Sequence, residues 1–166
     1  MKNTLIKSFA FMLLAASCWS CNALMRSENG GQRVKVRVAY LEVTEKDKNG
    51  EAWDPGGTAA TAKPDLFYTI SVDYDKKYES EMVGDSFSGR WSEPSKFIEV
   101  PPGEKLIFTF YDHDKSIGKS GMLHNPPDPI GEISLTIEEI TEAARTKKDY
   151  AFDRVIKCRF AAPVVK

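Results

Sequence analysis

The stretch from Leu106 to Ile133 reads LIFTFYDHDKSIGKSGMLHNPPDPIGEI and combines two apolar runs with a polar segment between them. An apolar, aromatic run ends at Tyr111, a segment rich in Gly, Ser and Pro follows, and a second apolar run begins at Ile130. Short apolar runs bounded by turn residues are typical of β-strands joined by a loop. We therefore predict two strands whose connecting loop carries the polar residues.

Three aspartates lie at the two ends of this loop: Asp112, Asp114 and Asp128. In an extended chain the side chains at i and i+2 point the same way, so Asp112 and Asp114 should face one point. Clustered carboxylates repel one another unless a cation lies among them, and hard oxygen ligands suit calcium. Aspartate is also common in turns, so this stretch alone leaves a metal site and a plain turn equally open.

The rest of the sequence predicts further short strands. Apolar and polar residues alternate from Val34 to Val43, which is the period of a half-buried strand. A helix is predicted from Glu138 to Arg145, because Thr136 and Glu139 form a capping box at its start. Turn signals recur at sandwich spacing and no long helical period occurs, which predicts an all-β, antiparallel sandwich of seven to eight strands with one short helix before the last strand. The other strands are expected at 65–72, 76–83, 97–100, 105–111, 130–137 and 150–161.

Residues 1–23 have the composition of an export signal. Lys2 and Lys7 precede a short apolar run from Phe9 to Ala16, and small residues follow the run. The run is too short to span a bilayer. We therefore expect the protein to be exported.

The end of this signal leaves two alternatives. Residues 14–18, LAASC, resemble a bacterial lipobox, which makes Cys18 the candidate for lipidation, although Ala15 stands where leucine is usual. Ordinary cleavage after Ala23 is the alternative. The protein is expected to be either a membrane-anchored lipoprotein or a secreted or periplasmic protein, with a polar, flexible tether over residues 24–32.

Three short patterns lie, in order, at the predicted strand ends. They are Asp54 with Asp65-Leu66-Phe67-Tyr68; Trp91-Ser92-Glu93 with Phe97 and Leu106; and Phe110-Tyr111-Asp112-His113-Asp114 with Asp128-Pro129-Ile130-Gly131-Glu132. Each pattern is weak alone, but in this order they resemble the C2 domain family of calcium- and phospholipid-binding modules. The resemblance implies an eight-stranded Greek-key β-sandwich over residues 33–162.

The resemblance also implies a calcium site. The family pattern places five aspartate carboxylates at one end of the sandwich, which would suffice for two calcium ions if some of the carboxylates bridge. The near absence of His and Cys favours calcium over zinc. Backbone oxygens of Trp53 and His113 are further candidates, and Asp47 is an alternative to Asp54. The insertion over residues 115–127 departs from the family pattern. The family's ligands correspond to Asp54, Asp65, Asp112, Asp114 and Asp128.

In calcium-binding members of this family, the loaded loops bind anionic phospholipid and apolar residues at the loop tips enter the membrane. The corresponding membrane-contact candidates in the loop after Asp112 are Ile117, Met122 and Leu123. Three aromatic residues near the same rim could either contact the membrane or pack inward: Trp53, Phe87 and Trp91. The predicted partner is an anionic phospholipid or membrane surface.

The alternative function is an exported, calcium-stabilised module for protein–protein interaction or adhesion, without lipid binding. The formal net charge of −1 does not predict a nucleic-acid partner. Only two histidines are present, and neither His113 nor His124 has the context of a catalytic triad. We therefore expect a binding module and not an enzyme.

Overall fold

Three antiparallel sheets make up most of the protein in a computed structural model that describes residues 30–53, 63–113 and 126–166. The strand order in the first sheet is β4 (Asp75–Glu79), β3 (Leu66–Val72), β7 (Leu106–Asp112), β8 (Asp128–Leu135). In the second it is β5 (Ser88–Gly89), β2 (Val38–Val43), β10 (Val155–Phe160), β9 (Tyr150–Phe152). The third, smaller sheet has the order β11 (Val164–Val165), β1 (Gln32–Lys35), β6 (Ile98–Val100).

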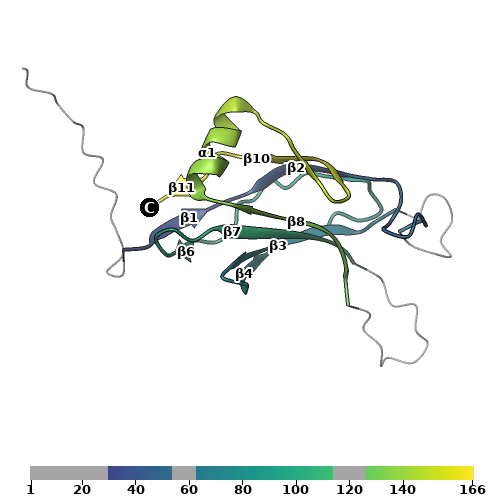
Figure 1. Ribbon diagram of the computed structural model, residues 1–166, viewed down its shortest axis with the longest axis horizontal. Coiled ribbons are helices and arrows are strands. Elements are labelled where there is room, and N and C mark those ends of the chain that lie inside the picture. The colour runs from purple at the N-terminus through teal and green to yellow at the C-terminus, as the bar shows by residue number, and fades with distance from the viewer. Residues whose placement is uncertain (1–29, 54–62, 114–125) are drawn as a thin grey trace, which may run out of the picture.

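The two larger sheets form the layers of a sandwich, with the hydrophobic core between them (Figure 1). Phe108 of β7 meets Phe160 of β10 edge to face, with 4.8 Å between ring centroids. Phe110 of β7 also meets Phe152 of β9 across the layers, at 5.8 Å and with tilted rings. These contacts confirm the predicted all-β sandwich, in which residues of one face of each sheet fill the interior.

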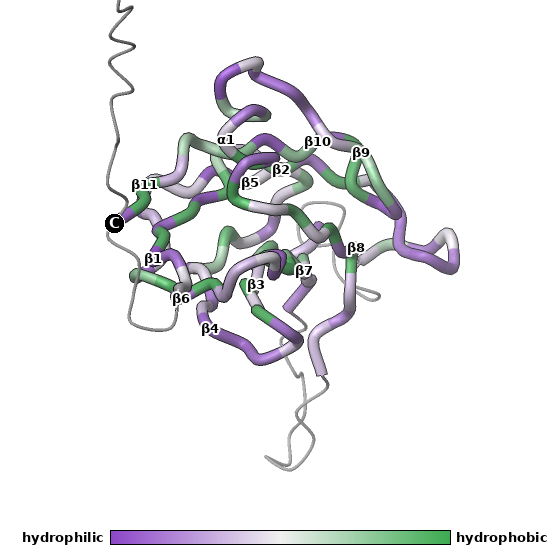
Figure 2. Tube along the Cα trace, turned by 60° about the vertical axis from the view of Figure 1, so that its left-hand side comes forward, coloured by the Kyte–Doolittle hydropathy of each residue, from purple (hydrophilic) through white to green (hydrophobic). Residues whose placement is uncertain are grey.

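The position of each strand follows from its sequence. Every residue of β3, LFYTISV, is buried, because β3 lies between β4 and β7 in its sheet. The edge strand β4, DKKYE, contains no buried residue and is hydrophilic in Figure 2. In this sheet the polar strand therefore lies at the edge, beside a fully buried strand.

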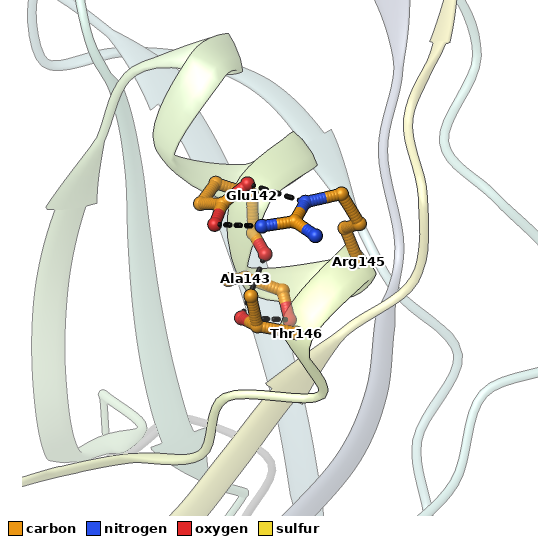
Figure 3. Close-up of polar contacts among 4 residues, drawn as sticks. All are labelled: Glu142, Ala143, Arg145 and Thr146. Carbon is orange, nitrogen blue, oxygen red and sulfur yellow. Dashed lines mark hydrogen bonds and ion pairs between the residues drawn. The ribbon is translucent and has the colours of Figure 1, made fainter.

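Helix α1 (Ile137–Thr146) confirms the predicted helix and its cap. The Thr136 hydroxyl accepts the Glu139 amide and the Glu139 carboxylate accepts the Thr136 amide, which is the predicted capping box. At the other end Arg145 pairs with Glu142, as Figure 3 shows. The helix ends at Thr146, and its C-cap residue Lys147 has a left-handed φ of 55°.

Two predicted strands are each divided in the structure. The strand predicted from Val34 to Val43 breaks at Val36, whose amide donates to the Ser95 hydroxyl and whose carbonyl accepts the Ser95 amide. The chain there passes from the β1 sheet to the β2 sheet. The strand predicted at 150–161 is the hairpin of β9 and β10, which turns at Asp153 with a φ of 46°. The predicted helix therefore precedes a hairpin and β11, not one last strand.

Two further differences concern short elements. The strand predicted at 76–83 ends at Glu79, although Val83 still forms an isolated bridge with Leu66. The two-residue strands β5 and β11 were not predicted, because so short a segment carries no period in the sequence. Within the described part of the chain, no helix has the length and apolar character needed to cross a bilayer.

Candidate metal-binding end of the sandwich

Strand register brings three of the predicted aspartates to the same end of the sandwich. Asp112, the last residue of β7, lies opposite Leu66, the first residue of β3, and also opposite Asp128, the first residue of β8. Asp65 directly precedes Leu66. This end, which we call the aspartate end, lies on the right in Figure 1, away from the C-terminus.

Backbone amides hold the carboxylates of Asp65 and Asp112. The Asp65 amide donates to Asp112 Oδ1 at 2.7 Å, and the Asp85 amide donates to Asp65 Oδ1 at 2.7 Å. The His113 amide donates to the Asp65 carbonyl oxygen at 3.0 Å. Asp65 and Asp112 are only 2% and 1% exposed, whereas Asp128 is exposed. Two buried carboxylates are therefore fixed in orientation at the end of the sandwich that also carries the exposed Asp128.

A segment that sequence reasoning did not assign to the site also borders it. Val83 pairs with Leu66, and a Cβ added to Gly84 would lie 3.2 Å from Asp65 Oδ1. Asp85, with a left-handed φ of 48°, turns its amide toward that carboxylate. Met82, beside this contact, is 48% exposed. Gly84 marks a turn in the sequence, but a turn signal does not indicate which residue the turn contacts.

The aromatic residues predicted near the rim pack inward in two cases. Trp53 is 4% exposed and its indole N–H donates to the Thr44 carbonyl at 2.8 Å. Trp91 is 7% exposed and donates to the Glu81 carbonyl at 2.7 Å. A buried indole needs such an acceptor, which explains their inward orientation. Phe87 is half-buried and packs against the core.

Asp47, the alternative to Asp54, organises its own turn. Its carboxylate accepts the backbone amides of Glu51 and Asn49, both at 2.8 Å, and the Asn49 side-chain amide at 3.0 Å. The hydrogen bond from the Glu51 amide is the main cause that lowers the pKa of Asp47. Asp47 and Asp128 line the same small pocket beside Trp53. Asp47 thus lies near the aspartate end, with both oxygens engaged in the turn.

The donor set at this end fits calcium. The acidic side chains supply oxygen only, and burying two carboxylates side by side is costly unless a cation compensates them. Among the residues that the structure describes, no three acidic, His or Cys side chains are close enough to hold an ion by themselves. A calcium site here would need further ligands, and segments 54–62 and 114–125, which contain Asp54 and Asp114, join the described chain at this end.

Several predicted residues lie outside the described residues. Two are the candidate ligands Asp54 and Asp114, and one is the candidate lipidation site Cys18. The membrane-contact candidates Ile117, Met122 and Leu123 also lie outside them.

The comparisons agree with this fold. The C2 domain family matches residues 32–152, and the chain belongs to this family. No curated protein sequence matches the chain significantly.

Solved structures with a similar fold include C2 domains of extended synaptotagmins and part of a phospholipase. A C2 domain of plant extended synaptotagmin 1 is 16% identical, with a TM-score of 0.51, over 81% of this chain and 94% of that domain. Extended synaptotagmin 2, solved with its SMP domain and two C2 domains, is 14% identical with a TM-score of 0.51, over 81% of this chain. Human GIVD cytosolic phospholipase A2 is 12% identical with a TM-score of 0.50, over 79% of this chain.

At these identities the likeness concerns the fold alone. This chain spans only 26% of the extended synaptotagmin 2 chain and 17% of the phospholipase chain. The activities and partners of those whole proteins therefore do not transfer to it.

Proposed function

We propose that this C2 domain is a binding module that holds calcium at the aspartate end and attaches there to anionic phospholipid membranes. One observation carries the proposal. The register of β3, β7 and β8 aligns the strand ends that bear Asp65, Asp112 and Asp128, at the end where both segments with the remaining candidate ligands join.

The described residues would prepare the site before calcium arrives. The amides of Asp65 and Asp85 orient the two buried carboxylates, so little side-chain entropy remains to be lost when a ligand binds. Bound calcium would supply positive charge where the free protein is acidic, and anionic head groups could then approach. Asp128, which is exposed, would lie on the side that faces them.

Apolar residues around the same end would contact the membrane. We retain Ile117, Met122 and Leu123 as the proposed contacts on the segment after Asp112. Met82 is a fourth, because it is 48% exposed on the neighbouring segment that contacts Asp65. Apolar side chains beside a cationic site would add hydrophobic insertion to the electrostatic attraction.

A second candidate function is a calcium-stabilised interaction module that binds protein and no lipid. The observation that favours it is that Asp65 and Asp112 tie β3, β7 and the Asp85 turn together through backbone hydrogen bonds. A cation held by these residues would stabilise the fold itself. The other surfaces would then be left for a partner protein.

Vesicle sedimentation tests the first candidate. Protein lacking residues 1–23 is mixed with phosphatidylserine-containing vesicles in calcium or in chelator, and we expect it to pellet with the vesicles in calcium only. Asp112→Asn should abolish the calcium-dependent sedimentation with vesicles. Asp149→Asn makes the same change of charge at an exposed site and should not abolish it. Calcium binding without any calcium-dependent pelleting would instead favour the interaction module.

We also propose that the protein is exported, with a lipid on Cys18 or with cleavage after Ala23. Intact mass measurement of the mature protein from the native cell separates the two outcomes. A mature chain that starts at residue 18 and carries the mass of attached acyl chains is expected for the lipoprotein. A chain that still contains residues 1–17 would contradict export by either route.

A further inference from the structure

Three cations surround one aromatic ring on the outer face of the β11–β1–β6 sheet. Lys35 Nζ lies 4.8 Å from the centroid of the Phe97 ring, Arg33 Cζ lies 5.3 Å from it, and Lys166 Nζ lies 5.9 Å from it. We call these four residues the Phe97 face. They come from three segments far apart in the sequence, so only the fold brings them together.

The register of the small sheet fixes this arrangement. Val34 points into the core and is fully buried, so its neighbours Arg33 and Lys35 point to the opposite face. Phe97 likewise precedes the buried Ile98, which pairs with Val34. The Lys166 amide donates to the Arg33 carbonyl at 2.8 Å and holds the last residue alongside.

The electrostatics of this face suit an anionic partner. Each cation gains a modest attraction from the ring, but three like charges around one ring repel one another. On this face the acidic Glu99 lies opposite Arg33 and offsets part of the positive charge. A surface that brings several negative charges to the Phe97 face would relieve the repulsion without breaking its contacts.

The position of the face separates it from the aspartate end. Strands β1, β6 and β11 lie on the left of Figure 1, at the end that carries the C-terminus, whereas the aspartate end lies on the right. The described chain begins at this same end, since β1 starts at Gln32. Residues that precede the domain therefore join it beside the Phe97 face.

We propose that the Phe97 face is a second, calcium-independent docking surface for an anionic phospholipid membrane. A sheet face presents its cations in one plane, and a half-exposed aromatic ring flanked by lysine and arginine is the composition that favours the head-group region. Val164 lies opposite Lys35 on β11 and is 55% exposed, which extends the apolar part of the face. An acidic protein segment is the competing occupant.

The test is vesicle sedimentation in chelator, with the same protein lacking residues 1–23. Vesicles of phosphatidylcholine with and without phosphatidylserine are compared at low and at physiological salt. The chelator removes any calcium-dependent attachment, so this result and that of the calcium experiment are independent. We expect binding to the anionic vesicles only, and weaker binding at higher salt, because salt screens the attraction between surface charges.

The variant that tests the face carries Arg33→Gln, Lys35→Gln and Lys166→Gln. Its partitioning onto anionic vesicles should fall at least about tenfold, since each cation near an anionic surface contributes separately. The matched control carries Lys46→Gln, Lys48→Gln and Lys147→Gln, three lysines elsewhere on the surface with the same loss of charge, and should bind like the parent protein. Circular dichroism should show that both variants are folded.

Several outcomes would overturn the proposal. One is the absence of binding to anionic vesicles in chelator at low salt. Another is an equal loss in the two triple variants, which would mean that only net charge matters. Binding to polyglutamate without binding to vesicles would also overturn it, because the face would then be a site for acidic protein.

Discussion

At the scale of single residues, the site depends on two aspartates that are almost inaccessible to solvent. The Asp85 amide donates to Asp65 and the Asp65 amide donates to Asp112, so backbone groups fix the orientation of both carboxylates. An amide donor carries no net charge, so these two hydrogen bonds do not cancel the charge of the carboxylates.

A residue-scale prediction concerns Cys158 of β10, the thiol in the core. Its side chain is fully buried and burial raises its pKa, so very little thiolate forms near neutral pH. We expect peptide mapping to find Cys158 unmodified by iodoacetamide at pH 8 in the native protein and fully modified in denaturant. Rapid labelling of the native protein would contradict the placement of this residue in the core.

A second residue-scale prediction concerns the ion pair of Asp149 and Arg159, whose two hydrogen bonds measure 2.8 and 3.0 Å. The bond from Arg159 lowers the pKa of Asp149 below its usual 3.8. The pair therefore stabilises the fold above that value and ceases to do so as the pH falls through the folded pKa.

We expect Asp149→Asn to lower the free energy of unfolding only slightly at pH 7, because the pair is partly exposed and screened by solvent. Urea titrations at several pH values measure the effect. The difference from the parent protein should vanish well below pH 3.8. A difference that grows as the pH falls would mean that the Asp149 pKa is raised.

At the scale of elements, α1 offers the sharpest prediction, because its cap is complete. Thr136→Ala removes the hydroxyl that accepts the Glu139 amide and should lower the free energy of unfolding by about 1 kcal/mol. Thr141→Ala is the matched control inside the same helix, where the hydroxyl bonds only to the Ile137 carbonyl and alanine is the better helix former. Equal losses in the two variants would show that the capping box does not stabilise α1.

The elements also show what the sequence could predict. The strands beginning at Leu66 and Leu106 and the helix after Thr136 were predicted closely, because long buried runs and a capping box are local signals. The break at Val36 was not predicted, because it depends on a hydrogen bond to Ser95, which is distant in the sequence. The turn at Asp153 was missed because strand-like alternation continues through it.

The same distinction applies to the site. Asp65, Asp112 and Asp128 lie at strand ends, so the fold predicted for those strands was enough to bring them together. The contact of Asp85 with Asp65 depends on how the chain returns after β4, which no local pattern specifies. The inward packing of Trp53 and Trp91 depends in the same way on carbonyl groups that only the fold supplies.

At the scale of the whole molecule, opposite properties occupy opposite ends of the sandwich. The aspartate end gathers acidic side chains, while the Phe97 face presents cations around a ring. The two ends would respond to different conditions, the first to calcium and the second to salt. The formal net charge of −1 does not reveal these two clusters.

Calcium titration by calorimetry, on protein lacking residues 1–23, tests the central claim most directly. We predict a saturable heat of calcium binding. The Asp112→Asn variant should bind calcium with an affinity at least about tenfold lower, because the substitution removes the charge of one ligand. Asp149→Asn should leave it unchanged, and magnesium should not reproduce it. The same heat in the Asp112→Asn variant, or no heat in the parent protein, would contradict a calcium site at the aspartate end.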